Sequence, residues 1–527
     1  MGKSLSLAAL ACAVLAPLGA SQSTDPFALQ TRWTLAAASN SAWIPSGVEF
    51  AAAGELVWAA GQGSAPRLVA LETTPLPDLA AVAPTFQSTL SAPFGVVSVA
   101  TGDDESALFT IAQYVTSDTS HRRTEIARYD AHGLAAGAYF PPVWRHNMGL
   151  VGNGTSKLAA ARDGSRVVCV THDALFQMLD LEWLDTTTGS ALTSRIGWSA
   201  TLRQMAASAD VRRVAVVVGA ELRIYDELAS VVYAETLATS TNALALSADG
   251  HTLAVGSGAT LRVLSDQSGS WNLERTLSSA PGEIVSRVGV SDDGRTLAAG
   301  WWNAQAVQAV RLEVWDTSNG VRAYERFFAG SGGTLQNFVE NAVVSRDGRR
   351  AAFGLWGSGD AAPEVVLVDR DSASELLAVD LGGSVRALAL DPTGTRVAVG
   401  FKHVHANQFG TTGSIRLFDT GERDVQLIEP PRAGQLAHVA AHMPGARQVM
   451  FVLGARSSGT PFLGGTLSVS RTQIQRMVRM ADASGRADLH WTLSPFAAQL
   501  DLAVQAVARI PGAGLRLSSN FVAPVVF

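Results

Sequence analysis

The sequence predicts an all-β protein in which a sheet-forming unit is repeated along most of the chain. Three observations lead to this prediction. Apolar and polar residues alternate with a period of two, as they do in half-buried strands. Forty-nine glycines and twenty prolines, spread over 527 residues, indicate many turns between short strands. A turn-centred segment returns about every 40 to 60 residues, which is a period typical of repeated β-sheet units.

Each unit contains a strand, an Asp-Gly type turn, a second strand, and a third strand that ends in aspartate. The clearest copy runs from Asn242 to Asp266, NALALSADGHTLAVGSGATLRVLSD. Eight units are recognisable, with turns near Gly54, Asp104, Asp163, Asp210, Asp249, Asp293, Asp347 and Thr393. Because tight turns of this kind need a left-handed residue, we expect positive φ at Gly250, Gly294, Gly348 and Gly394.

The repeat predicts a β-propeller over residues 33–430. A four-stranded sheet cannot bury both of its faces alone, and stacking such sheets around an axis buries them. We expect eight blades, or seven if the first unit or the unit at Asp104 does not close a blade. After Pro430 and Pro431 the pattern stops, and residues 431–527 are predicted to form a small β-sandwich-like domain.

The units resemble a known group of repeats at their turns and third strands. Ser-Ala-Asp249-Gly250, Ser-Asp-Asp293-Gly294 and the Trp315-Asp316 dipeptide are similar to the repeats of bacterial WD40-like and YVTN-like propellers. The Gly-His element of strict WD40 repeats is absent. The resemblance implies the fold over residues 33–430 but no particular activity, because propellers host many unrelated functions.

The first 21 residues are typical of a signal peptide. Lys3 precedes an apolar run from Leu5 to Leu18 that is too short to span a membrane. We therefore expect an exported protein that is periplasmic, cell-surface or secreted and has no membrane span; lipidation at Cys12 is the alternative. The net charge of −6 gives no attraction to phosphate backbones, so nucleic acid is not an expected partner.

The sequence contains none of the strong catalytic or cofactor motifs. It has no H-E-x-x-H, G-x-S-x-G, Walker or EF-hand pattern, so we predict no catalytic residue, no metal and no cofactor. Cys169 is the one cysteine that follows the signal segment, and it lies in a strand-like run. We expect it to be a buried apolar residue and not a reactive thiol.

A first group of candidate site residues stands eight positions before the turn glycine or its equivalent. Seven of the eight units have a polar residue there: Ser46, Ser156, Arg203, Asn242, Ser286, Glu340 and Arg386. In a propeller this ring would lie at the channel mouth, on the top face opposite the Asp-Gly turns. It would either hold a small polar ligand or only solvate strand ends. The candidate ligand-binding residues from the ring are Arg203, Asn242, Glu340 and Arg386.

A second group lies in the top loops of three consecutive units. These loops carry Trp302, Trp356, and the pair His403 and His405. Exposed aromatic side chains on adjacent loops contact partners or stack on sugars, and the alternative is that they pack down on the propeller. The two histidines alternate as metal ligands do, but no Asp, Glu or Cys is close in sequence, so we predict no metal site.

These residues predict a non-enzymatic binding or scaffold protein. Its top face would bind a protein, peptide or glycan. The alternative is a propeller hydrolase, lactonase-like or glycan-cleaving, that acts at the channel mouth. Such an enzyme would need paired carboxylates or a metal cluster, and Glu340 is the only acidic member of the ring. The sequence therefore favours binding over catalysis without deciding between them.

Overall fold

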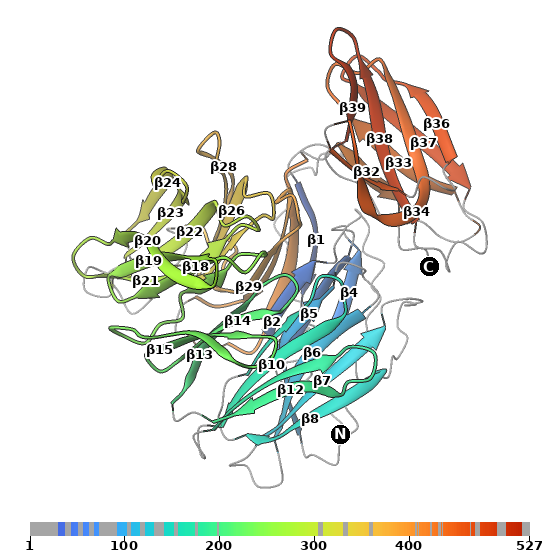
Figure 1. The fold of residues 1–527 in the computed structure, drawn as a ribbon. Coiled ribbons are helices and arrows are strands. Elements are labelled where there is room, and N and C mark those ends of the chain that lie inside the picture. Colours follow the sequence, from blue (N-terminus) through green and yellow to red (C-terminus); the bar gives the residue numbers. More distant parts are fainter. Residues whose placement is uncertain are drawn as a thin grey trace, which may run out of the picture.

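A computed structural model describes most of the chain between Gln30 and Ser518. The described residues are 30–36, 44–50, 56–62, 68–72, 92–102, 107–115, 122–130, 142–151, 156–173, 178–197, 200–303, 309–329, 336–357, 362–405, 408, 410–421, 424–429, 434, 436–463, 465–469, 475–492 and 502–518. Within these ranges the fold is all-β, with strands and turns but no helix, as predicted (Figure 1). The predicted signal peptide, residues 1–21, lies outside the described residues, as do the turns at Gly54 and Asp104.

Antiparallel sheets follow one another along the chain as far as residue 419. The first has seven strands: β2 (Ile44–Phe50), β3 (Leu56–Gln62), β4 (Leu68–Glu72), β5 (Ala92–Thr101), β6 (Ala107–Val115), β7 (Arg122–Asp130) and β8 (Trp144–Val151). One residue pair, Gln62 with Gly95, joins β2–β4 to β5–β8. The next sheet contains β9 (Ser156–Ala160), β10 (Arg166–Asp173), β11 (Met178–Asp185) and β12 (Ala191–Ile196).

Five further sheets of four strands complete this part of the fold. Two contain β13 (Leu202–Ala207), β14 (Arg213–Val218), β15 (Glu221–Asp226) and β16 (Val231–Thr236), and then β17 (Leu244–Leu246), β18 (Thr252–Ser257), β19 (Thr260–Gln267) and β20 (Ser270–Ser278). Two more contain β21 (Glu283–Val290), β22 (Thr296–Asn303), β23 (Ala309–Asp316) and β24 (Val321–Phe328), and then β25 (Val339–Val344), β26 (Arg350–Leu355), β27 (Val365–Asp369) and β28 (Ser374–Val379). The last contains β29 (Val385–Leu390), β30 (Arg396–Lys402), β31 (Gly413–Asp419) and β1 (Gln30–Ala36).

The Ser-x-Asp-Gly turns form because their side chains bond to their own backbone. Ser291 Oγ donates to Asp293 Oδ1 at 2.7 Å and accepts the N–H of Thr296 at 2.9 Å, while Asp293 Oδ1 accepts the N–H of Arg295 at 3.0 Å. The same bonds recur in the turns that begin at Ser208, Ser247 and Ser345. The expected positive φ is confirmed at all four glycines, with 73°, 71°, 72° and 68° at Gly250, Gly294, Gly348 and Gly394.

The aspartate that ends the third strand has an equally local role. Its carboxylate accepts backbone N–H groups from the residues that follow it, and so closes the turn into the fourth strand. This bond is made by Asp185, Asp226, Asp266, Asp316 and Asp369, and Asp419 makes the same bond at the end of β31, whose sheet has β1 as its fourth strand. The recurring Asp in the sequence is therefore a turn-forming residue.

Neighbouring sheets contact each other through glycines of their second strands. A Cβ at Gly256, Gly300 or Gly354 would lie between 2.5 and 2.7 Å from the side chain of Val285, Val339 or Val385, respectively, in the sheet that follows. Only glycine permits such a close approach. Gly400 of β30 has the same relation to Pro45 of β2, at 2.6 Å.

Strand β1 adds the N-terminal end of the described chain to the last of these sheets. It pairs with β31 from Gln30 opposite Asp419 to Ala36 opposite Ser414, so this sheet begins three residues before the predicted boundary at residue 33. Buried side chains of β2 and β3 share a core with β29–β31: Val48, Phe50, Val57, Ala59, Ala387, Ala389, Ala398, Ile415 and Leu417. Strands β1, β2 and β3 are therefore joined to β29–β31 by hydrogen bonds or by packing.

Two further sheets follow. One contains β32 (Val425–Glu429), β33 (Leu436–His442) and β37 (Arg486–Thr492); the other contains β34 (Gln448–Phe462), β35 (Gly465–Val469), β36 (Gln475–Met480), β38 (Leu502–Ile510) and β39 (Gly514–Leu517). A single core cluster takes buried side chains from both sheets, among them Val439 and Phe451. Val425 is fully buried in that core and β32 pairs with β33, so β32 belongs to these sheets.

Candidate functional site

The predicted ring of polar residues coincides with a set of β-bulges. We call β2, β5, β9, β13, β17, β21, β25 and β29 the first strands. Six of them carry a bulge at the ring position, at Ser46, Val97, Arg203, Ser286, Glu340 and Arg386. A bulge re-aims a side chain and is frequent beside functional sites. We call this end of the first strands the bulge end.

The ring residues divide into two kinds. The hydroxyl groups of the serines are tied to the protein: Ser286 Oγ donates to the carbonyl of Gly300 at 3.0 Å, and Ser156 Oγ accepts from Gln113 Nε2 at 3.1 Å. Ser46 Oγ makes a longer contact of 3.4 Å with the carbonyl of Ala60. By contrast, Arg203, Asn242 and Arg386 are exposed, and Glu340 is half-buried. The solvent-accessible candidates are thus the four residues selected from the sequence.

Glu340 is held by two neighbours. Trp356 Nε1 donates to its Oε2 at 2.9 Å, and Arg287 donates to its Oε1 at 3.3 Å and to its backbone carbonyl at 2.8 Å. Sequence analysis selected Glu340 and Trp356 separately, and the structure brings them into direct contact. It did not select Arg287, which directly follows the bulged Ser286.

Trp302 and Trp356 belong to one aromatic cluster whose central member is Phe338. The ring centroid of Phe338 lies 5.4 Å from that of Trp302 and 5.2 Å from that of Trp356. The Arg287 guanidinium lies 5.6 Å from the Phe338 centroid. All three aromatic side chains are half-buried, so each keeps part of its surface accessible to solvent. Sequence analysis missed Phe338, which precedes β25.

Two lysines share the bulge end with Glu340. Burial lowers the pKa of Lys157, and the positive charge of Arg287 lowers it further, while Glu340 opposes both effects. Burial likewise lowers the pKa of Lys402, with Arg386 adding to the effect and Glu340 opposing it. These are the only lysines in the described ranges. Cationic groups therefore outnumber the one carboxylate that acts on them.

His403 and His405 do not face a common point. His403 contacts the hydroxyls of Ser414 and Thr412, at 2.6 and 3.2 Å. His405 Nδ1 instead lies 3.5 Å from Glu364 Oε1, a fully buried carboxylate. Burial raises the pKa of Glu364 to about 8. In the described part of the chain, no group of three or more His, Cys, Asp or Glu residues is arranged to hold a metal ion.

The opposite end of the first strands contains a feature that sequence analysis missed. The second residue of each turn donates its backbone N–H to the carbonyl of the equivalent residue in the next sheet. These bonds run from Arg162 to Ala209, Ala248, Asp292, Arg346 and Pro392, with N–O distances of 2.8, 2.8, 3.1, 3.3 and 3.1 Å. We call this end, defined by these six residues, the turn end.

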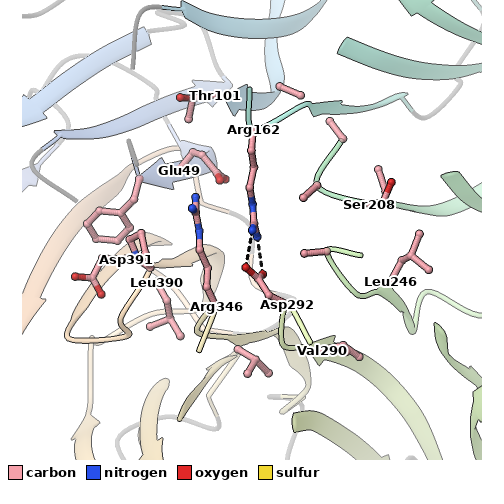
Figure 2. Close-up of a pocket in the computed structure, with 18 residues that line it drawn as sticks. Glu49, Thr101, Arg162, Ser208, Leu246, Val290, Asp292, Arg346, Leu390 and Asp391 are labelled. Atoms are coloured by element: carbon pink, nitrogen blue, oxygen red, sulfur yellow. Dashed lines mark hydrogen bonds and ion pairs between the residues drawn. The ribbon is translucent and has the colours of Figure 1, made fainter. Parts of the chain in front are cut away.

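A cavity of about 300 Å³ lies at the turn end. Its lining comes from every first strand or the turn that follows it: Glu49, Phe50, Thr101, Ala159, Ala160, Arg162, Ala207, Ser208, Ala209, Leu246, Ala248, Val290, Asp292, Val344, Arg346, Leu390, Asp391 and Pro392. Figure 2 shows Glu49, Arg346, Arg162 and Asp292 converging on the space between the strand ends.

Four of these lining groups are charged or chargeable and interact with one another. Arg162 donates two hydrogen bonds of 2.5 Å to Asp292 (Figure 2). Burial raises the pKa of Glu49 to about 7, although Arg346 and Arg162 both act to lower it. A detectable signal was present in the sequence, because charged residues occupy the second turn position at 162, 292 and 346, where three other units have Ala209, Ala248 and Pro392.

No protein-family model matches the chain, and no curated protein matches it. Within the described ranges, no helix has the length and apolar character needed to cross a membrane.

Proposed function

We propose that this chain is an exported, non-enzymatic binding protein that recognises a carboxylate-bearing protein, peptide or glycan at its bulge end. We further propose that the repeat region is an eight-bladed β-propeller of the WD40-like kind, followed by a β-sandwich-like domain. Support for eight blades comes from the glycine contacts that continue from Gly400 to Pro45, and from the cavity lined by all eight first strands. Support for export comes from the signal-like residues 1–21.

The observation that carries the binding proposal is the charge at the bulge end. Lys157, Lys402, Arg287 and Arg386 lie at this end, where Glu340 is the carboxylate that opposes the lowering of both lysine pKa values. Lys157 is the most informative of the four, because it is half-buried and burial lowers the pKa of its ammonium group. Removing a cation from water is costly, and an incoming carboxylate offsets part of that cost.

The aromatic cluster supplies a second kind of contact beside these charges. Trp302, Phe338 and Trp356 are half-buried next to Glu340, so part of each ring remains accessible to a ligand. Aromatic surface combined with a charged anchor is the usual composition of residues that dominate binding energy. The proposal therefore places a ligand carboxylate near Lys157 and its carbon skeleton against these rings.

The test uses oligogalacturonates and glutamate-rich peptides as probes, with neutral oligosaccharides and glutamine-rich peptides of equal length as comparisons. Calorimetric titration of the folded protein should show binding of at least one acidic probe and none of its neutral counterpart. Lys157→Gln should weaken that binding about 5- to 30-fold, since a charge-assisted hydrogen bond contributes roughly 1–2 kcal/mol. Arg349→Gln is the matched control at the turn end, where its side chain is 55% exposed.

Two results would contradict the proposal. One is equal binding of acidic and neutral probes, which would remove the role of charge. The other is an unchanged dissociation constant in Lys157→Gln, which would place the ligand elsewhere on the protein.

A further inference from the structure

Three titratable side chains meet between the seven-stranded sheet and the sheet that follows it. His146 of β8 contacts Glu182 of β11, with an Nε2–Oε2 distance of 2.6 Å. Asp180 precedes Glu182 by two residues, so both carboxyl groups lie on the same face of β11, and their side chains hydrogen-bond to each other. Because His146 belongs to one sheet and the two carboxyl groups belong to the other, the cluster joins the sheets.

The hydrogen bond between Asp180 and Glu182 requires a proton, because two ionised carboxylates repel each other. Asp180 is the group that retains it. Its Oδ1 is buried, and no hydrogen-bond donor in the described part of the chain reaches that atom. Burial and the charge of Glu182 raise the pKa of Asp180 to about 7. The hydrogen bond to Glu182 raises the pKa of His146 above its ordinary value.

The strands on either side of β11 bring no charge to the carboxyl pair. On β10 the residue opposite Glu182 is Cys169, whose thiol is neutral because burial raises its pKa. On β12 the residues opposite Glu182 and Asp180 are Ser194 and Ile196. Ionisation of Asp180 therefore places a second negative charge beside Glu182 without a new counter-ion from these strands.

The arginines nearest to His146 on β7 and β8 have other partners. Arg128 donates to the carbonyl of Thr186 at 2.8 Å. Arg145 lies on the opposite face of β8 from His146 and forms an ion pair with Glu125, with an N–O distance of 3.2 Å. Within the described ranges, His146 is thus the cation that contacts the carboxyl pair.

We propose that His146, Glu182 and Asp180 form a proton-dependent lock between these two sheets. When the cluster is fully protonated, it contains an imidazolium, a carboxylate and a carboxylic acid, so its net charge is zero and β8 is attracted to β11. When His146 and Asp180 have both lost their protons, two carboxylates face a neutral imidazole. Charges that are removed from water and unbalanced are costly, so the lock is closed in mildly acidic solution and weakens as the pH rises above neutral.

Cys169 reports on this junction. It is fully buried, and its Sγ lies 3.7 Å from Sδ of Met148 on β8, across the contact between the two sheets. Its thiol can therefore react with a reagent in solution only after β8 has moved away from β10, or after the protein has unfolded. The sequence has one other cysteine, Cys12, which serine replaces in the parent protein of the experiment.

The experiment measures the rate at which dithiodipyridine reacts with Cys169 at pH 5 and pH 8. Asp180→Asn keeps a hydrogen-bond donor for Glu182 but cannot ionise. At pH 8 the parent protein should react about tenfold faster than Asp180→Asn, and at pH 5 the two rates should agree. The expected ratio follows from the displaced Asp180 pKa, reduced because the group is partly solvated. Asp371→Asn is the matched control, since this side chain is 58% exposed, and it should react as the parent does.

Urea unfolding at the same two pH values separates local opening from global unfolding. The folded state raises the pKa of both Asp180 and His146, so it binds more protons than the unfolded chain, and stability falls as the pH rises from about 4 through 7. The unfolding equilibrium constant of the parent, divided by that of Asp180→Asn, should therefore increase about tenfold or more between pH 5 and pH 8.

Three results would overturn the proposal. The first is an equal rate of Cys169 modification at pH 8 in the parent and in Asp180→Asn, and the second is a parallel pH dependence of unfolding in the two proteins. The third does not depend on the folding of a variant: the His146 ring, followed by NMR in the parent, should titrate above the ordinary value of about 6.5, and a midpoint at or below it contradicts the lock. None of these measurements requires a ligand, so they are independent of the binding proposal.

Discussion

The guanidinium of Arg162 and the carboxylate of Asp292 are joined by two hydrogen bonds of 2.5 Å, although the residues are 130 positions apart in the chain. Arg162 follows β9 and Asp292 follows β21, and Figure 2 shows the two side chains meeting across the cavity. Each of the two side chains is 32% exposed to solvent, because the cavity is open beside it. The pair links two turns that have no direct backbone bond to each other among the bonds at the turn end.

A double-mutant cycle on this pair should show a clear coupling energy. Arg162→Ala and Asp292→Ala each leave one charge without its bidentate partner, so we expect a coupling of roughly 1–2 kcal/mol in the free energy of unfolding. Urea denaturation of the two single variants and the double variant measures it. The control cycle uses Arg295 and Asp293, which lie 3.8 Å apart and are largely exposed, and should give less than about 0.5 kcal/mol. Equal coupling in both cycles would contradict the prediction.

Replacement of Gly294 by alanine should destabilise the fold more than replacement of Gly382. Both glycines have a positive φ, 71° and 70°, so alanine costs about 1 kcal/mol at either position. A Cβ at Gly294 would in addition clash with the side chain of Thr252, whereas a Cβ at Gly382 would have no described atom within 4 Å. We therefore expect about 1 kcal/mol for Gly382→Ala and about 2 kcal/mol or more for Gly294→Ala. Chemical denaturation measures both, and a neutral Gly382→Ala would refute the backbone part of the argument.

Glu49→Gln should remove a pH-dependent loss of stability. The folded state raises the pKa of Glu49 from 4.5 to about 7, so folding favours the protonated form and stability from this group falls as pH rises from about 4.5 to 7. Glutamine does not ionise, so the variant does not lose stability at this position as the pH rises. The unfolding free energy of the variant relative to the unmodified protein should therefore increase by up to about 3 kcal/mol between pH 4.5 and pH 8.

Urea midpoints at pH 5 and pH 8 measure this change. Glu221→Gln is a suitable control, because the Glu221 side chain is 51% exposed. Parallel pH curves for Glu49→Gln and the unmodified protein would show that burial does not perturb this carboxyl group.

Two tryptophan-to-phenylalanine variants should behave differently. Trp356→Phe removes the hydrogen bond to the Glu340 carboxylate, so we expect a loss of about 1–2 kcal/mol in unfolding free energy. The indole N–H of Trp302 is buried and has no hydrogen-bond partner in the described part of the chain, so Trp302→Phe removes no bond and should change stability by less than about 0.5 kcal/mol. Thermal and urea unfolding compare the two. A larger loss of unfolding free energy in Trp302→Phe than in Trp356→Phe would contradict the prediction that the bond to Glu340 makes the difference.

The local elements of this fold could be predicted because their determinants are close together in sequence. In the turn at Ser291, the side-chain bonds of Ser291 and Asp293 reach no further than Thr296, five residues ahead. Strand alternation and the need for glycine at a positive φ are equally local properties. The positive φ values at Gly250 and Gly348 and the absence of helices in the described ranges followed from such patterns.

The sites depended on contacts that no local pattern contains. The sequence singled out Glu340 and Trp356, but their hydrogen bond, and the contact of Trp356 with Phe338, arise only when β25 and β26 are paired and bulged. The cavity is a stronger case, since Glu49, Arg162 and Asp292 come from three different sheets. Patterns within short segments predicted the strands and the turns, because apolar alternation and turn-forming side-chain bonds within five residues are local properties. The stacking of the sheets decides which side chains face one another across the ends of the first strands. It brings together residues that are more than one hundred positions apart in the chain.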